Sequence, residues 1–344
     1  MQALRKILIG LGGFALLVFA IAIFLPSRVR IERRIVIDAP AATIFSLAND
    51  FRQVGKWSPW QESDPNARYT ITGPPRGVGA TLAWEGNIVG KGSQKIIESA
   101  PYSKIVSELE LGGRSDIVAT FQLSAGDMGT QVVWSFDADF GLNLPARYTG
   151  LLLDGIVGDD YEAGLQNLKT MAERMPRADF SDTEIEIIVV EAQDIAYLST
   201  TSIPLAAAIS DAMRNSYSKV LGFIDQHKLT EAGAPISISR GYRGQDLAFD
   251  AAIPVHGISD DTPRNEPGVK LGHTYAGPVI RVKHVGSYLA LGRTHDKIAA
   301  YLAALGIERN GDAWESYVVD ATRTAEADLV TYVYYPIRDS GNLP

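Results

Sequence analysis

Residues 29–40 read Val29-Arg-Ile-Glu-Arg-Arg-Ile-Val-Ile-Asp-Ala-Pro40, and this stretch decides how the first half of the chain folds. Its β-branched residues alternate in part with charged ones, which is typical of a strand with one buried face. Asp38-Ala-Pro40 then turns the chain into a short predicted helix over Ala41–Phe51. The apolar residues on one face of that helix are Ile44, Leu47 and Phe51. This order of strand, turn and short helix predicts an α+β domain that begins near residue 28.

A series of short strand-like segments follows, separated by turns rich in glycine and proline. The predicted strands are Tyr69–Thr72, Ala80–Trp84, Gly92–Ser99, Lys104–Leu111, Ile117–Leu123 and Thr130–Phe136. A longer helical segment, Tyr148–Met175, with apolar residues that include Leu151, Ile156, Leu165, Leu168 and Met171, closes the unit. We therefore expect residues 28–176 to form a helix-grip domain, in which a curved antiparallel sheet wraps round a helix. Such an arrangement can leave a cavity between sheet and helix.

This first domain resembles the polyketide-cyclase-like branch of the START/SRPBCC superfamily. The residues that carry the resemblance are Val36-Ile-Asp-Ala-Pro40, Ile44-Phe45, Trp57-Ser-Pro-Trp60, Gly77-Val-Gly79, Trp84-Glu-Gly86 and Gly129-Thr-Gln-Val-Val-Trp134. The resemblance implies a cavity for a hydrophobic ligand. The superfamily includes both carriers and enzymes, and no catalytic residue is carried over to this chain.

Tryptophans are candidates for the wall of that cavity, and we expect Trp60 and Trp84 to contact a ligand. The alternative interpretation is that these residues, together with Trp57 and Trp134, pack in the core or at its rim, because tryptophan is usually well buried without touching a ligand.

The N-terminal segment Ile7–Leu25 contains no charged or strongly polar residue and is nineteen residues long (25 − 7 + 1). At about 1.5 Å per residue a helix of that length can cross a hydrocarbon core of about 30 Å. We therefore predict a membrane anchor within residues 1–27 and a single-pass membrane protein. A cleaved signal peptide with Ala20-Ile21-Ala22 as its cleavage site is the alternative. Basic residues flank both ends almost equally, and we expect the soluble part to be periplasmic or extracytoplasmic.

Residues 176–182 are polar and read as a linker, and the chain beyond them contains a weak internal repeat. Each half ends alike, with Asp250-Ala-Ala-Ile-Pro-Val255 in the first and Tyr332-Val-Tyr-Tyr-Pro-Ile337 in the second. The predicted strands are Ile185–Val190, Ile195–Thr200, Ile236–Arg240, Leu247–Val255, Val279–His284, Glu315–Val319 and Leu329–Ile337, and the predicted helices are Leu205–His227 and Tyr288–Leu305. We therefore expect residues 181–338 to form two β-α-β-β units about a pseudo-twofold axis, with a groove between them.

The second half of this domain resembles the gyrase-inhibitor-like effector-binding domains found in AraC- and MerR-type regulators. The matching stretches are Ala276-Gly-Pro-Val-Ile-Arg-Val-Lys-His-Val-Gly-Ser-Tyr288, Trp314-Glu-Ser-Tyr317 and Leu329-Val-Thr-Tyr-Val-Tyr-Tyr-Pro-Ile337. The resemblance implies that Glu315 faces a pocket and meets cationic, aromatic ligands. Two features depart from the family: Tyr332 stands where an acid is common, and the DNA-binding segment of the regulators is absent.

The residue types fit that chemistry independently. A carboxylate among aromatic rings can neutralise a desolvated organic cation, and each ring face adds about 0.5–2 kcal/mol of cation–π attraction. On a strand Glu315 and Tyr317 share one face, and Tyr332 and Tyr334 share one face of theirs. With Tyr288 these residues are the predicted ligand contacts of the second domain. The alternative is a surface glutamate beside core tyrosines.

Composition and charge argue against some classes of partner. Binding to nucleic-acid phosphates needs clustered lysine and arginine, and the net charge of −8 argues against such a surface, so we expect no nucleic acid among the partners. The chain has no cysteine, and its five histidines never occur as HxH or HxxxH, so we expect no metal and no cofactor. We predict a membrane-anchored, non-enzymatic binder or sensor of small hydrophobic or amphipathic molecules, cationic ones included. The alternatives are a hydrolase that acts through Glu315 and a protein-interaction module.

Overall fold

The computed structural model describes residues 2–266 and 268–338. The chain divides into two compact units, with the division between Ser181 and Asp182. Each unit is described by itself.

The first helix, α1 (Gln2–Phe24), lies where the sequence predicts an apolar helix. Its C-terminal part contacts helix α5 of the first unit, because the hydroxyl of Tyr148 donates to the carbonyl of Val18 at 2.6 Å. Within the described residues, no helix combines the length and the hydropathy needed to cross a bilayer. The single-pass anchor predicted over Ile7–Leu25 is therefore not supported, although the helix itself is present.

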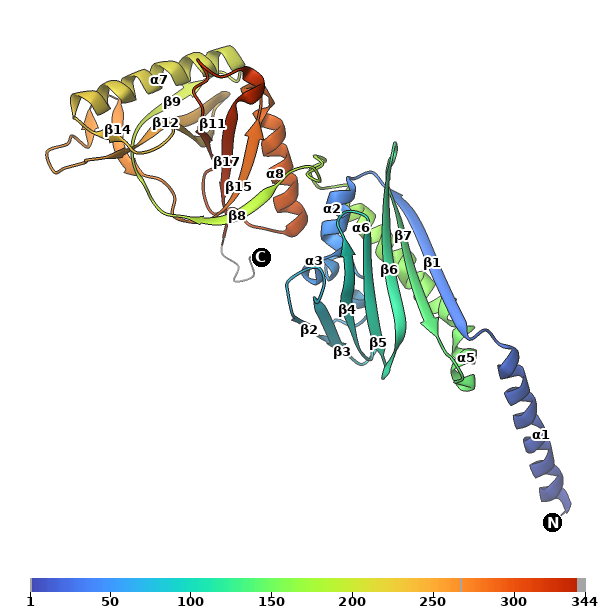
Figure 1. Cartoon of the computed structure of the whole chain (residues 1–344). Coiled ribbons are helices and arrows are strands. Elements are labelled where there is room, and N and C mark those ends of the chain that lie inside the picture. Colours follow the sequence, from blue (N-terminus) through green and yellow to red (C-terminus); the bar gives the residue numbers. More distant parts are fainter. Residues whose placement is uncertain (1, 267, 339–344) are drawn as a thin grey trace. The chain divides into compact units, whose positions relative to one another are not determined.

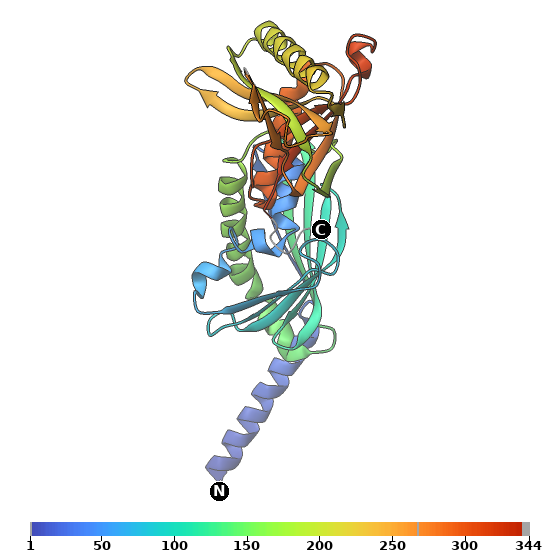
Figure 2. The same ribbon diagram turned by 90° about the vertical axis from the view of Figure 1, so that its left-hand side faces the viewer.

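The rest of the first unit is an antiparallel sheet that packs against helices. Within the described residues, seven strands follow the order β1-β7-β6-β5-β4-β3-β2. Helix α6 runs along one face of this sheet in both views (Figures 1 and 2). The strands are β1 (Arg28–Ile37), β2 (Arg68–Thr72), β3 (Thr81–Glu85), β4 (Lys91–Ala100), β5 (Lys104–Leu111), β6 (Arg114–Gly126) and β7 (Gly129–Asp139), and the helices are α2 (Ala41–Ala48), α3 (Phe51–Val54), α4 (Trp60–Ser63), α5 (Leu144–Gly150) and α6 (Asp159–Ala172).

The long helix predicted over 148–175 is interrupted. Between α5 and α6 lies a π-helical turn over Asp154–Gly158, and Leu151 and Ile156, predicted on the apolar face, are 59% and 60% exposed. Gly158, at the end of this turn, leaves room for Arg33, because a Cβ there would lie 2.1 Å from a guanidinium nitrogen of that residue. Helix α6 then continues as predicted and buries Leu165 and Leu168.

Strands β1 and β7 approach each other closely at Gly129. This residue has φ +112°, and a Cβ on it would lie 2.2 Å from the carbonyl oxygen of Ile37. Both the backbone conformation and the close approach require glycine.

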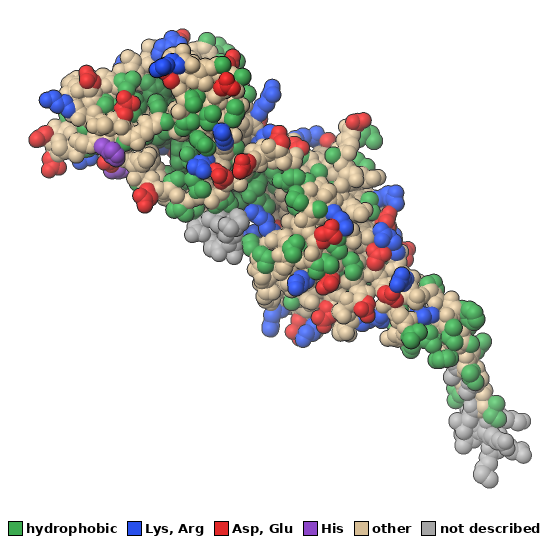
Figure 3. All heavy atoms as spheres, viewed as in Figure 1, with side chains coloured by type: hydrophobic (Ala, Val, Ile, Leu, Met, Phe, Trp, Pro, Cys, Tyr) green, Lys and Arg blue, Asp and Glu red, His purple; other side chains and the backbone are tan. Residues whose placement is uncertain are grey.

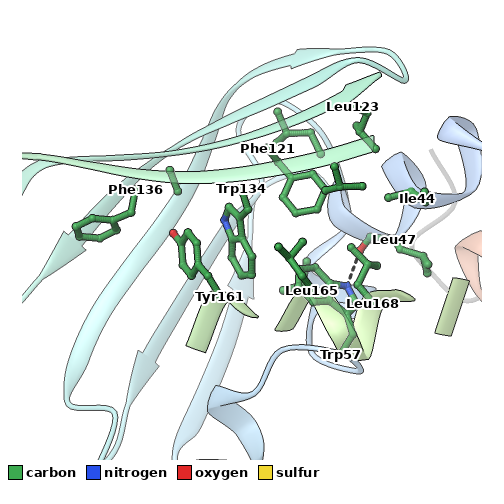
Figure 4. Packing of buried hydrophobic residues seen from close by; sticks show 14 of the residues in the cluster. Ile44, Leu47, Trp57, Phe121, Leu123, Trp134, Phe136, Tyr161, Leu165 and Leu168 are labelled. Carbon is green, nitrogen blue, oxygen red and sulfur yellow. Dashed lines mark hydrogen bonds between the residues drawn. The ribbon is translucent and has the colours of Figure 1, made fainter. Parts of the chain in front are cut away.

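The core of the first unit fills the space between the sheet and α6 (Figure 4). Trp57 and Trp134 are 3% and 6% exposed, and the ring of Trp134 stacks on that of Tyr161 at 3.8 Å between centroids. The indole nitrogen of Trp57 donates to the carbonyl of Leu47 at 3.1 Å. Trp57 and Trp134 are thus core residues, as the alternative interpretation of the tryptophans expects.

The second unit is built on one antiparallel sheet with the main order β13-β14-β9-β12-β11-β16-β17-β15-β8, and β10 pairs with β12. Its strands are β8 (Ile185–Val190), β9 (Asp194–Ser202), β10 (Thr230–Glu231), β11 (Ile236–Arg243), β12 (Asp246–His256), β13 (Asn265–Glu266), β14 (Val269–His273), β15 (Gly277–Val285), β16 (Trp314–Tyr317) and β17 (Val330–Pro336). Helices α7 (Ala206–Gln226) and α8 (Leu291–Leu305) complete the unit. The β-α-β-β order expected from the sequence repeat is present twice, as β15-α8-β16-β17 and as β9-α7-β11-β12 with the two-residue strand β10 inserted after α7.

The two halves exchange strands β8 and β14. Strand β8 precedes β9 in the chain but pairs with β15, and β14 precedes β15 but pairs with β9. The short connections 191–193 and 274–276 therefore run between the halves. Gln193 and Thr274 bond to each other there: the Thr274 amide donates to the Gln193 carbonyl and the Gln193 amide to the Thr274 hydroxyl, each at 2.9 Å.

Both helices of this unit cover one face of the sheet. Val220 and Phe223 of α7 pack against Ile253 of β12. Ile298 of α8 packs against Val333 of β17. On the other face a separate apolar cluster joins both halves, with Ile195, Ile236, Ile238, Ala252, Val279 and Trp314 as its buried members. The sheet thus has a helix-covered face and an inner face with its own side-chain cluster.

Candidate ligand-binding site

Strand β16 places its side chains alternately on the two faces of the sheet. Glu315 and Tyr317 lie on the helix-covered face, where Glu315 is paired with Val333 of β17. Trp314 lies on the inner face. The alternation predicted from the sequence is therefore present, and it directs the carboxylate of Glu315 toward α8.

Four side chains form a hydrogen-bonded chain in the order Tyr317, Glu315, His295 and Tyr335. The hydroxyl of Tyr317 donates to Oε2 of Glu315, and Nε2 of His295 lies 2.8 Å from Oε1. The other ring nitrogen of His295, Nδ1, lies 2.8 Å from the hydroxyl of Tyr335. One neutral tautomer satisfies these contacts, with Tyr335 donating to Nδ1 and Nε2–H donating to the carboxylate. Both oxygens of Glu315 are thus engaged, while its side chain keeps 21% exposure.

Further tyrosines surround this carboxylate. The ring of Tyr288 meets that of Tyr317 edge to face, with centroids 5.4 Å apart. Tyr217 of α7 donates its hydroxyl to the carbonyl of Ile236 at 2.8 Å. Burial, and then the negative charge of Glu315, raise the pKa of Tyr217 and of Tyr317 well above its ordinary value. These two phenols therefore stay neutral and can act as hydrogen-bond donors.

The sheet separates the predicted second-domain contacts into two groups. Glu315, Tyr317 and Tyr288 come together, but Tyr332 and Tyr334 lie on the opposite face. The reason is the pairing register, since Tyr334 lies opposite Trp314 and Tyr332 opposite Ser316. The five residues therefore do not share one face of the sheet, and their contact with a ligand stays a prediction.

Each of the two tyrosines on the inner face has a partner of its own. Tyr334 stacks on Trp314, with centroids 4.8 Å apart and ring planes at 5°. The guanidinium of Arg281 lies 5.2 Å from the ring centroid of Tyr332.

The predicted ligand contacts of the first domain, Trp60 and Trp84, pack against other residues of the first unit. The indole nitrogen of Trp60 donates to Oδ2 of Asp160 at 2.8 Å, and its ring packs edge-on against Trp134. Trp84 lies opposite Gly92 of the neighbouring strand, and a Cβ on that glycine would lie 2.5 Å from the indole ring. Both tryptophans are half-buried, and their role in binding stays a prediction.

Sequence reasoning missed His295, Tyr217 and Tyr335. A signal for His295 is present in the sequence, because it follows Tyr288 by seven residues, two helical turns, within the predicted helix 288–305. Among residues 2–266 and 268–338, no group of three or more His, Asp or Glu side chains is arranged to hold a metal ion.

Comparison with known families agrees with this architecture. Residues 28–173 match the family described as polyketide cyclase / dehydrase and lipid transport. Residues 183–338 match the GyrI-like small molecule binding domain. The chain carries one domain of each family. Both resemblances inferred from the sequence, and their order along the chain, are thereby confirmed.

Comparison with curated proteins gives no match. Among solved structures, the C-terminal domain of EcmrR is 14% identical with a TM-score of 0.37, covering 45% of this chain and 98% of that one. A hydrolase from Listeria innocua is 13% identical with a TM-score of 0.33, covering 45% and 92%. The Aha1 dimer from Colwellia psychrerythraea is 19% identical with a TM-score of 0.30, covering 42% and 97%. These likenesses are weak and none bears on function.

Proposed function

We propose that the protein is a binder or sensor of small amphipathic molecules, and that its GyrI-like domain recognises an organic cation through Glu315. The observation that carries the proposal is the carboxylate held by Tyr317 and His295 among the rings of further tyrosines. The family descriptions of both domains support a ligand-binding role.

The physical reason lies in the combination of a fixed charge with aromatic surface. Donors on both carboxylate oxygens orient Glu315 and stabilise its charge, so little reorganisation is needed when a cation arrives. Rings beside the carboxylate offer apolar area and cation–π attraction to a lipophilic cation. A neutral molecule of the same shape would gain the apolar contacts only.

The test compares a lipophilic cationic dye with an uncharged analogue of similar shape. Glu315→Gln keeps the volume of the side chain and removes its charge. We expect the affinity for the cationic dye to fall by about one to two orders of magnitude, as for loss of a hydrogen bond or contact with a charged group worth about 1.5–3 kcal/mol. The uncharged analogue should bind as before. Glu308→Gln, at a side chain that is 68% exposed, is the matched control.

Equal losses for both dyes in Glu315→Gln would point to damaged packing. Unchanged binding of the cationic dye would remove Glu315 from the site. Either result would refute the proposal.

A finer part of the proposal is that α1 holds the protein at a lipid surface. Large apolar side chains of this helix are exposed to solvent, with Phe14 at 66%, Phe19 at 57% and Phe24 at 88%, and hydrophobic residues gather there (Figure 3). We expect deletion of residues 1–27 to move the protein from the membrane fraction to the soluble fraction. Full-length protein that fractionates with the soluble proteins would contradict this part.

Acid–base catalysis by the same cluster is a second candidate function, and the contact between His295 and Glu315 favours it. A carboxylate that orients a histidine resembles the arrangement used by general bases. Product formation from a small-molecule library, detected by mass spectrometry and lost in both Glu315→Gln and His295→Asn, would support catalysis. Binding without any turnover would favour the binder.

A further inference from the structure

Apolar side chains around α5 form a second exposed surface of the first unit. This α5 surface consists of Leu142, which is 92% exposed, and of Leu151 and Leu152, which follow α5 directly and are also exposed. Within residues 141–153 the only charged side chain is that of Arg147. Exposed apolar side chains that gather in one segment mark an interaction site. We therefore expect the α5 surface to meet a partner.

Arg147 and Tyr148 hold α5 against the end of α1. Nη1 of Arg147 donates to the carbonyls of Ile23 and Leu25, each at 3.1 Å. The hydroxyl of Tyr148 donates to the carbonyl of Val18, which precedes Leu25 by seven residues (25 − 18). At about 1.5 Å per residue this separation is about 10 Å. Helix α5 therefore lies alongside the last two turns of α1 (Figure 1).

The remaining sides of α1 expose apolar side chains. Ala22, on the side that α5 covers, is 2% exposed. Leu16, Leu17, Phe19 and Ile21 are exposed, and at about 100° per residue they point in directions spread around the other sides. A globular partner covers one face of a helix, whereas lipid surrounds a helix that is apolar on all sides. Lipid is therefore the partner that fits α1 and the neighbouring α5 surface together.

We infer that the α5 surface enters the lipid interface beside α1. The inference rests on the lipid role proposed for α1 and extends it to the body of the first unit. If the last two turns of α1 lie in lipid, the bonds from Arg147 and Tyr148 bring α5 to the same depth. Both side chains suit the headgroup boundary, because each joins an apolar body to a polar end. Arg147 already has carbonyl partners, which lowers the cost of removing its guanidinium from water.

The test measures the depth of a fluorescent label in the bilayer. The chain has no cysteine, so one introduced cysteine carries an environment-sensitive nitrobenzoxadiazole label at a single position. Leu152→Cys reports on the α5 surface, and Phe14→Cys reports on α1. Met128→Cys is the control, because Met128 is 80% exposed and lies at the opposite end of β7 from α5. Each labelled full-length protein is reconstituted in vesicles of phosphatidylcholine and phosphatidylglycerol, and quenching by nitroxide-labelled lipids gives the depth.

We expect the label of Leu152→Cys to lie about 5–10 Å into the boundary between headgroups and acyl chains, and the label of Met128→Cys to escape quenching. Quenching in Phe14→Cys without quenching in Leu152→Cys overturns the inference and leaves the role of α1 intact. Absence of quenching in both variants overturns both. Equal quenching in Leu152→Cys and Met128→Cys also overturns the inference, because lipid contact would not be specific to the α5 surface. If Leu152→Cys fails to fold, as judged by circular dichroism, Leu142→Cys takes its place.

Discussion

Replacing Tyr317 with phenylalanine tests whether Glu315 is a charged acceptor in the ligand-free protein. The hydroxyl of Tyr317 is buried and donates to Oε2 of Glu315, so the substitution removes one of the two donors on that carboxylate. His295 keeps the other oxygen occupied at 2.8 Å. The aromatic ring and its edge-to-face contact with Tyr288 remain. The change therefore removes the hydrogen bond to Glu315 and the one between this hydroxyl and Ser237, and little else.

The size of the effect follows from the charge and the burial of the acceptor. A hydrogen bond to a charged group contributes about 1.5–3 kcal/mol, and one between neutral groups about 1 kcal/mol. The side chain of Glu315 is 21% exposed, so solvent screens it only in part. We expect Tyr317→Phe to lower the free energy of unfolding by about 2 kcal/mol in the natural background, and by about 1 kcal/mol in the Glu315→Gln background. The difference, about 1 kcal/mol, is the coupling that belongs to the charge.

Scanning calorimetry of the full-length protein measures these differences. For a domain of this size a loss of 1 kcal/mol lowers the unfolding midpoint by about 2–4 °C, so Tyr317→Phe should shift the second unit by about 4–8 °C. Ser237→Ala is the control, because Ser237 bonds to the same hydroxyl without touching the charge of interest. Equal shifts for Tyr317→Phe in both backgrounds would refute a charged Glu315. A shift below about 1 °C would show that the hydroxyl makes no useful bond.

Other predictions concern both units. Burial raises the pKa of Tyr161, so this tyrosine ionises near pH 10 in the unfolded chain but stays neutral in the folded one. Its contribution to stability is therefore full below about pH 10 and is lost as the pH rises further. Tyr161→Phe should flatten the fall in unfolding free energy between about pH 9 and 11. Leu168→Ala, at a side chain with 0% exposure, should cost about 2–5 kcal/mol in urea unfolding. Gly129→Ala should cost at least about 2 kcal/mol, whereas Gly126→Ala in the same hairpin, with no close contact, should cost less than half as much. Limited proteolysis should cut within residues 176–182 and leave two stable fragments, and a single resistant product would contradict independent units.

Much of the fold could be predicted from local patterns. The alternation in residues 29–37 and the turn at Asp38-Ala-Pro40 place β1 and α2 close to their observed positions. Strands β13 and β14 were missed, because they are short and carry charged residues and glycine instead of an apolar alternation. The break between α5 and α6 was missed because Leu151 and Ile156 extend the helical apolar pattern across the π-helical turn, so the local pattern gives no signal for it.

The candidate site, too, could be predicted from the sequence only in part. Periodicity within β16 correctly places Glu315 and Tyr317 on one face, since side chains alternate along any strand. Periodicity does not show which residues of β17 share a face with Glu315. The register that pairs Trp314 with Tyr334 determines this, and it places Tyr334 on the face opposite to Glu315. The contact of His295 with Glu315 depends on how α8 is turned above the sheet, which a single helical pattern leaves open.

The exchange of β8 and β14 affects how this domain folds while the ribosome synthesises it. Glu186 of β8 finds its ion-pair partner in Arg281 of β15, 95 residues later. At about 5–20 residues per second the ribosome needs roughly 5–20 s to supply that partner, and during this time β8 is an unpaired strand edge. Such long-range pairing slows folding, and open edges invite association with other chains. The half that contains β9, β11, β12 and β14 ends at residue 273 and can form first, whereas the half that contains β8 is completed only when β15, β16 and β17 have been made. Any chaperone that covers β8 in the interval should therefore govern the yield of folded protein.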